Sequence, residues 1–257
     1  MPRLLLTNDD GADSPGIHAI ARALEAAGHE VVVAAPADER SGWSAGVGYL
    51  VDGVEFDVDR AEVPGAPRID AWAIEGPPAF CVLAGMLEMF GPRPDFVVSG
   101  SNLGTNCGRG VLHSGTVGGA MIAQNFGLSA IAVSQQDGSP MLWETSEAVT
   151  VAAVDWLAAA PRKTVLNINI PNAAVSDLSG VRWARLAAFG STNTGLVGIP
   201  PGRMRIQVTP REVELKADTD THLVDDGFVT VTGLVGFRAE SDVSPDAVES
   251  MAKSLSG

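Results

Sequence analysis

The first part of the chain alternates between apolar runs and polar, turn-forming residues. Residues 3–7 form a short apolar run, and apolar positions within 15–27 then recur at the spacing of one helical face. Ser14 is placed to cap this helix, and Pro15 suits its first turn. Residues 30–36 are continuously apolar, which is typical of a strand buried on both faces of a parallel sheet. The pattern predicts a β-α-β unit.

The same alternation continues to residue 170. We expect further helices at 78–90, 116–126 and 144–159. We expect further strands at 95–99, 130–134 and 164–170. Strands that alternate with helices favour a doubly wound α/β sheet. In such a sheet, ligands bind beyond the carboxyl ends of the strands, so the residues that follow each strand are the candidates for chemistry.

The C-terminal part of the chain has a different pattern. Residues 204–216 and 226–237 have the pattern expected of extended, partly alternating strands, and a last helix is expected over 245–255. We therefore divide the chain into an α/β core at 1–180 and a smaller, hairpin-bearing appendage at 181–257. Extended arms of this kind often mediate oligomerisation.

Composition and charge narrow the class of protein. The chain has 257 residues, of which 46% are hydrophobic and 19% charged, which is typical of a globular protein with a large core. Its net charge is −14, which disfavours nucleic-acid duplexes and anionic membranes as partners. Cys81 and Cys107 form no CxxC motif, and we expect a reduced, cytoplasmic protein without a signal peptide or membrane span.

The first candidate site follows the first predicted strand. Asp9 and Asp10 are adjacent carboxylates, and a hard divalent cation such as Mg²⁺ or Mn²⁺ is the simplest way to keep both ionised. The alternative is an ordinary Asp-rich turn. Beyond the second strand, Ser41 offers an oxygen and Arg40 a cation, although taken alone this segment is better explained as a solvated loop.

The third candidate segment runs from Ser99 to Ala120 and is rich in glycine. Glycine lets backbone N–H groups turn toward a ligand, and residues 114–116 would begin a helix whose N-terminus favours phosphate. Asn102 and Asn106 add carboxamides, and His113 lies beside the predicted anion site. The segment lacks the order of a P-loop or of a dinucleotide-binding turn. The alternative is a glycine-rich packing loop.

These segments resemble, in their order, the SurE family of metal-dependent 5′/3′-nucleotidases. LLLTNDDGADSPGI is similar to the family's N-terminal signature, APADERSG to its second loop, and VVSGSNLGTNCGRGVLHSGTVGGA to its central glycine-rich motif. LNINIP at 166–171 and TDTHLVDDGFVTVT at 219–232 also resemble family segments. The resemblance spans nearly the whole chain.

The resemblance implies a Rossmann-like, three-layer α/β fold with a C-terminal β-hairpin extension that builds homodimers or homotetramers by exchange. It implies one divalent metal ion per subunit, with Asp9, Asp10, Ser41 and Asn102 as ligands. It implies a pocket for the phosphate of a small substrate, lined by Asn8, Asn106, Ser114, Gly115 and Thr116, with Arg109 and His113 as further candidates.

This chain also departs from the family pattern. Phe80 replaces an acidic residue, Arg109 and Gly110 stand where an Asp is usual, and Ile122 replaces a Glu. The aromatic cluster common in the family's hairpin is missing from RMRIQVTP. All of these positions lie outside the expected metal ligands, so we expect metal binding and phosphate hydrolysis to be kept, whereas the departures leave the preferred substrate open.

The expected activity is hydrolysis of the phosphate monoester of nucleoside 5′- or 3′-monophosphates, with Asp9 orienting or deprotonating the attacking water. One alternative is a catalytically weak protein that binds a nucleotide or phosphorylated metabolite in the same pocket. Another is a phosphatase with a non-nucleotide substrate. A phosphoacceptor domain is disfavoured, because Ser99 to Asn102 stand where such a domain needs an acceptor Asp.

Overall fold

The computed structural model describes residues 1–188, 192–199, 202–210 and 215–236. These residues form one large sheet and a separate β-hairpin. The strands of the large sheet are β1 (Arg3–Thr7), β2 (Glu30–Pro36), β3 (Val58–Ala61), β4 (Asp70–Ile74), β5 (Phe96–Leu103), β6 (Ser129–Gln135), β7 (Val165–Ile170), β8 (Gly180–Trp183) and β11 (Phe228–Leu234).

The order across the sheet is β3-β4-β2-β1-β5-β6-β7-β11-β8. The central run from β4 to β7 is parallel throughout. β3 is antiparallel to β4, and β11 is antiparallel to β7 but parallel to β8. The chain reverses its direction of winding on either side of β1, so the predicted doubly wound α/β fold is confirmed.

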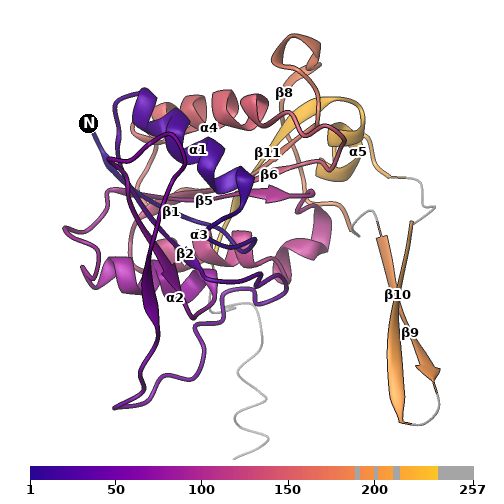
Figure 1. The fold of residues 1–257 in the computed structure, drawn as a ribbon. Helices are drawn as coiled ribbons and strands as arrows, with labels where there is room; N and C mark the ends of the chain where they lie inside the picture. The colour runs from indigo at the N-terminus through magenta and orange to yellow at the C-terminus, as the bar shows by residue number, and fades with distance from the viewer. Residues whose placement is uncertain (189–191, 200–201, 211–214, 237–257) are drawn as a thin grey trace, which may run out of the picture.

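Helices cover both faces of the sheet (Figure 1). One face carries α1 (Pro15–Ala26) and α4 (Trp143–Leu157), and the other carries α2 (Pro78–Met86) and α3 (Gly115–Asn125). Short helices lie at η1 (Gly108–Leu112), η2 (Val175–Asp177) and α5 (Asp220–Asp225). The result is the expected three-layer arrangement.

An apolar core lies on each face of the sheet, between the strands and the helices that cover them. Side chains alternate along each strand, so Leu4 and Leu6 pack with Ile17 in one core while Leu5 packs with Val82 in the other. All five side chains are at most 2% exposed. A strand with both faces covered must be apolar at consecutive positions, which explains the unbroken runs in the sequence.

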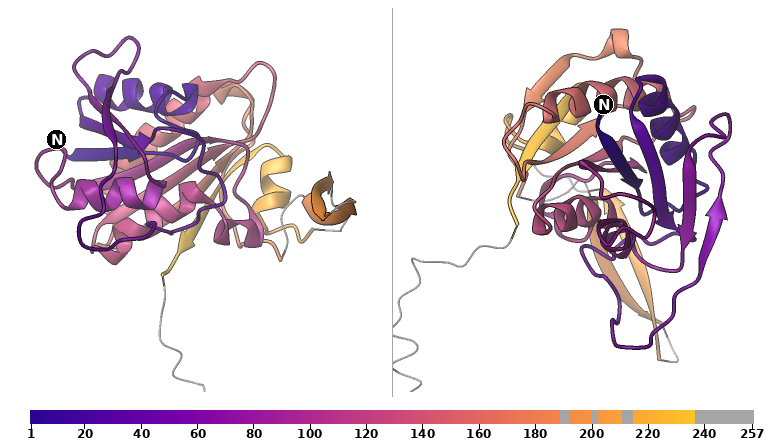
Figure 2. Two further views of the ribbon diagram at one scale, coloured as in Figure 1. Left: turned by 60° about the horizontal axis from the view of Figure 1, so that its bottom comes forward. Right: turned by 90° about the vertical axis from the view of Figure 1, so that its left-hand side faces the viewer.

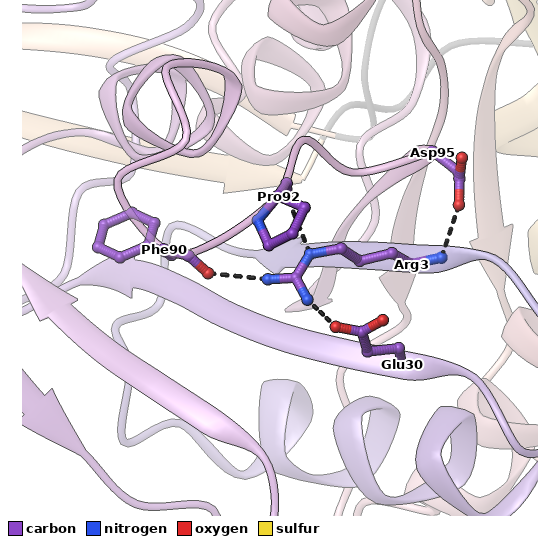
Figure 3. A network of polar contacts seen from close by, with 5 residues as sticks. All are labelled: Arg3, Glu30, Phe90, Pro92 and Asp95. Atoms are coloured by element: carbon purple, nitrogen blue, oxygen red, sulfur yellow. Dashed lines mark hydrogen bonds and ion pairs between the residues drawn. The ribbon is translucent and has the colours of Figure 1, made fainter.

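Arg3 joins three segments at the amino-terminal edge of the sheet (Figure 3). Its guanidinium donates to the backbone carbonyls of Phe90 and Pro92, both at 2.8 Å, and pairs with the carboxylate of Glu30 on β2. Its backbone N–H donates to Asp95, just before β5, at 2.8 Å. These contacts hold the starts of β1, β2 and β5 together, at the edge opposite their carboxyl ends.

The hairpin of β9 (Thr192–Ile199) and β10 (Arg203–Pro210) extends away from the body (Figures 1 and 2). Leu196, Met204, Ile206 and Val208 are exposed on it. β9 was not predicted, and it is the antiparallel partner of β10. The helix expected over 245–255 lies outside the described residues.

The predicted boundary at residue 180 does not separate two sheets. β11, which we assigned to the appendage, pairs with β7, and β8 then pairs with β11. Alternation along a strand shows that one face is buried, but it does not show which strand lies beside it. β3 and β4 were also missed, because both are short and β3 is partly polar.

Candidate functional site

The carboxyl end of β1 carries a buried asparagine. Asn8 is fully buried, and its Nδ2 donates to the carbonyl of Gly11 at 3.0 Å and to Oγ of Ser14 at 2.7 Å. Ser14 stands at the N-cap of α1 as expected, but its hydroxyl makes no capping hydrogen bond. Ser14 thus takes the predicted N-cap position, but its hydroxyl accepts a hydrogen bond from Asn8 and none from the helix. Oδ1 of Asn8 is buried and has no hydrogen-bond partner among the residues that the structure describes.

Asp9 is 2% exposed and lies between two other segments. Its side chain accepts a hydrogen bond from the hydroxyl of Thr116 on α3, and its backbone carbonyl accepts from the N–H of Arg40 at 2.7 Å. A Cβ atom at Gly115 would lie 2.8 Å from the Asp9 side chain, so only glycine lets α3 approach this closely. Burial raises the pKa of Asp9, and the Thr116 hydroxyl opposes that shift.

Asp10 completes an acidic pair. It accepts a hydrogen bond from the N–H of Leu103, at the end of β5, at 3.2 Å. Burial and, to a lesser degree, the charge of Asp9 raise the pKa of Asp10 to about 7. Glu39 adds a smaller repulsion to both carboxyls. Two carboxylates that resist ionisation side by side form an arrangement that a divalent cation stabilises.

Asn102 and Ser41, the other expected metal ligands, lie on the two segments that border this pair. Nδ2 of Asn102 donates to the carbonyl of Gly104 at 2.6 Å, which leaves its Oδ1 as the ligand atom. Ser41 is exposed and follows Arg40, whose N–H contacts Asp9. The order of the sheet, with β1 between β2 and β5, thus brings the loops after these strands to one edge.

The residues present fit a hard divalent cation. All of the candidate ligands are oxygen atoms, and the side chain of Asn8 leaves one more buried oxygen without a partner. Among the described residues, no cluster of three or more His, Cys, Asp or Glu side chains is placed to hold a metal. A cation here would therefore need neutral ligands such as Ser41 and Asn102 beside the two carboxylates.

The N-terminus of α3 faces the acidic pair. Oγ of Ser114 accepts the N–H of Val117 at 3.1 Å, so this hydroxyl serves as the helix cap. The hydroxyl of Thr116 is bonded to Asp9. The backbone N–H groups of the first helical turn at Gly115 and Thr116 are the donors suited to an anion.

The outer candidates lie on the 3₁₀ helix η1 and at its end. Arg109 and His113 are exposed, and within the described part of the chain neither side chain is hydrogen-bonded to the acidic pair.

Asn106 is held by residues that the sequence analysis did not select: Ser134, Asn167 and Asn169. The sequence analysis also missed Asp220, whose carboxylate accepts the N–H of Gly108 in the glycine-rich loop. Polar side chains within otherwise apolar strands are the signal that could have found the two asparagines.

Two of the departures from the family pattern lie in apolar surroundings. Phe80 stacks on Phe56, with ring centroids 4.2 Å apart, and packs against the core between the sheet and α2. Ile122 of α3 also packs against this core. Both residues contribute to packing beside the site.

The fold and the site together define a class of protein. It is a Rossmann-like α/β protein in which buried carboxylates face a helix N-terminus at the carboxyl edge of the sheet, a setting suited to a divalent cation and a phosphate group. Among the described residues, none of the helices combines the length and apolar character required to cross a membrane.

Comparisons with known proteins give the family. The family model of survival protein SurE matches residues 4–192. The chain is 37% identical to the 5′/3′-nucleotidase SurE of Cronobacter sakazakii over 238 residues, which cover 90% of this chain and 89% of that protein. It is 37% identical to the 5′-nucleotidase SurE of Xanthomonas campestris, with 90% and 88% covered. The crystal structure of the SurE protein from Aquifex aeolicus matches with a TM-score of 0.74 at 31% identity, and all of both chains is covered. The chain belongs to the SurE family.

Proposed function

We propose that this protein is a metal-dependent phosphatase that hydrolyses nucleoside 5′- or 3′-monophosphates to a nucleoside and inorganic phosphate. The observation that carries the proposal is the buried acidic pair, Asp9 and Asp10, set against the N-terminus of α3. Relatives named 5′-nucleotidase SurE and 5′/3′-nucleotidase SurE support the activity and the substrate class.

Asp9, Asp10, Ser41 and Asn102 would hold one Mg²⁺ or Mn²⁺ ion. The ion would supply Lewis acidity toward the phosphate and lower the pKa of a bound water. The all-oxygen ligand set is the reason to prefer these two hard cations.

The chain's own residues position the reactants. The N–H groups at Gly115 and Thr116 bind phosphate oxygens and stabilise the charge that these oxygens carry. Asp9 orients the attacking water and accepts its proton, while the hydroxyl of Thr116 fixes the Asp9 carboxylate. Asn8 and Asn106 offer further polar contacts to the phosphate, and Arg109 and His113 lie at the outer rim.

Three finer features belong to the same proposal. The exposed apolar side chains of β9 and β10 support a homodimer or homotetramer formed through the hairpin. Cys81 and Cys107 are buried and unpaired, which supports a reducing, cytoplasmic location. We retain a core at 1–180 and a C-terminal extension at 181–257 as a division of roles, catalysis and assembly, although both contribute strands to the large sheet.

The test is phosphate release from 5′- and 3′-nucleotides, sugar phosphates and short polyphosphate in the presence of Mg²⁺, Mn²⁺ or EDTA. Asp9→Asn should abolish turnover without loss of fold. Asp13→Asn is the matched control, since Asp13 is a nearby but exposed acid. Metal-dependent release that survives in Asp9→Asn would refute the role of Asp9. Absence of release from any substrate by the wild type would favour the binding-protein alternative.

A further inference from the structure

The glycine-rich loop between β5 and α3 is held by side chains from distant parts of the chain. Two of them, Asn167 and Asn169, are on β7 and are fully buried. Their neighbours Leu166, Ile168 and Ile170 pack in the core on the other face of the sheet. A carboxamide inside a buried strand is costly unless it is hydrogen-bonded, so these residues need partners.

Both β7 asparagines contact the backbone of Asn106. Oδ1 of Asn169 accepts the N–H of Asn106 at 2.7 Å, and its Nδ2 donates to the carbonyl of the same residue at 3.2 Å. Nδ2 of Asn167 donates to that carbonyl at 2.8 Å. One side chain thus pairs with both backbone groups of a loop residue, as a neighbouring strand would. These contacts fix the orientation of the Asn106 peptide groups.

The side chain of Asn106 is fixed as well. Its Nδ2 donates to Oγ of Ser134, a fully buried hydroxyl on β6, at 2.9 Å. A hydroxyl can donate or accept, so Ser134 can hold the amide in either orientation. The remaining polar atom of the Asn106 carboxamide is then available to a ligand.

A third contact holds the loop two residues further on. Asp220, at the start of α5, is fully buried, and its Oδ2 accepts the N–H of Gly108 at 2.8 Å. Its Oδ1 accepts the N–H groups of Ala187 at 2.9 Å and Thr221 at 2.8 Å. Three backbone donors satisfy this buried carboxylate, and one of them belongs to the loop that leads into α3.

We infer that Asn167, Asn169 and Asp220 are positioning residues for the phosphate-binding loop. They hold Asn106 and Gly108 so that the N-terminus of α3 is presented correctly to the phosphate, and none of them is hydrogen-bonded to the acidic pair in the described structure. They therefore govern phosphate binding rather than metal binding. This inference rests on the proposed phosphatase function.

Two variants test the inference. Asp220→Asn keeps the shape of the side chain but replaces one accepting oxygen by an NH₂ group. This group would face either the N–H of Gly108 or the N–H groups of Ala187 and Thr221, so donor would oppose donor. Asn167→Leu also keeps the size, and within the described part of the chain it removes a single hydrogen bond, because Oδ1 of Asn167 has no partner there. It therefore remains informative if Asp220→Asn does not fold. Asp218→Asn is the matched control, since its exposed carboxylate pairs, among the described residues, with Arg185 alone, at 3.7 Å.

The measurements are kcat and KM with the best nucleotide substrate, the inhibition constant of inorganic phosphate, and Mn²⁺ affinity by electron paramagnetic resonance. A displaced loop should lower kcat/KM by about 10- to 100-fold and weaken phosphate inhibition by about tenfold. Mn²⁺ affinity should stay within about threefold of the wild type, and Asp218→Asn should match the wild type.

Unchanged phosphate inhibition in folded variants would overturn the inference, as would a parallel loss of Mn²⁺ affinity. If the wild type shows no turnover, calorimetric titration with inorganic phosphate in the presence of Mn²⁺ still compares the variants. Phosphate binding that weakens in the variants would then support the loop assignment while the phosphatase proposal fails. Absence of phosphate binding in the wild type would overturn both.

Discussion

The substitution Gly118→Ala is expected to push the loop after β2 away from helix α3. A Cβ atom at Gly118 would lie 1.9 Å from the carbonyl oxygen of Ser44 and 2.6 Å from the backbone N of Ala45. Both are backbone atoms, so no side-chain rotation can relieve the contact. Ordinary contact needs a separation of about 3.5 Å, so the loop must move by about 1.5 Å.

Gly118→Ala is expected to destabilise the protein, whereas Gly→Ala at an open helical position stabilises it. In an unobstructed helix the change favours folding by about 1 kcal/mol, whereas overpacking costs about 1–3 kcal/mol. We therefore expect Gly118→Ala to lower the free energy of unfolding by up to about 2 kcal/mol. Ser41 lies on the displaced loop, and a shift of this size at a ligand lowers kcat/KM by about 100-fold.

The assay combines urea unfolding, Mn²⁺ binding and metal-dependent phosphate release. Gly110→Ala is the control for stability, because a Cβ atom there would meet none of the described residues within 4 Å. If Gly118→Ala is more stable than the wild type and retains its Mn²⁺ affinity, then the loop does not depend on the missing side chain, and the reasoning fails.

Three further predictions concern the same edge of the sheet. Thr116→Val should weaken Mn²⁺ binding by about tenfold or more, because the charged Asp9 carboxylate loses a hydrogen bond. Thr116→Ser keeps the hydroxyl and should bind Mn²⁺ as the wild type does. Equal Mn²⁺ affinities for the wild type and both variants, measured by calorimetry, would contradict this prediction. The pKa of Asp10 is raised by burial from 3.8 to about 7, so the folded, metal-free protein binds this proton more tightly than the unfolded chain does. Its contribution to stability is present below about pH 4 and lost as the pH rises toward 7; urea midpoints in EDTA should show this loss, and Asp10→Asn should remove it. Gly16→Ala would place a Cβ atom 2.2 Å from the carbonyl oxygen of Ser101. The midpoint of thermal unfolding should therefore fall by about 2–10 °C. An unchanged midpoint would show that α1 and β5 can move apart at little cost.

The sequence allowed the acidic pair and the start of α3 to be predicted as one site. Asp9 follows a buried strand, Gly115 begins a helix, and parallel strands end at a common edge, so local patterns and one topological rule were sufficient. Their contact in the structure, through Thr116, follows from this order.

The support of the glycine-rich loop could not be predicted in this way. Asn169 contacts Asn106 across 63 positions, and Asp220 contacts Gly108 across 112. Such contacts depend on which strands become neighbours, and hydrophobic alternation does not encode that choice. The pairing of β11 with β7 was missed for the same reason, and it is this pairing that brings α5 to the loop.

The hairpin leaves the body and returns to it at the same place. Arg185, before the hairpin, forms a bridge with Thr219 after it, and Asp220 binds the N–H of Ala187. The arm is thus an insertion whose two ends are already joined by the core, and its length is decoupled from the register of the large sheet. The hairpin can therefore be lengthened, shortened or re-shaped without rebuilding the large sheet or displacing the acidic pair at its carboxyl edge.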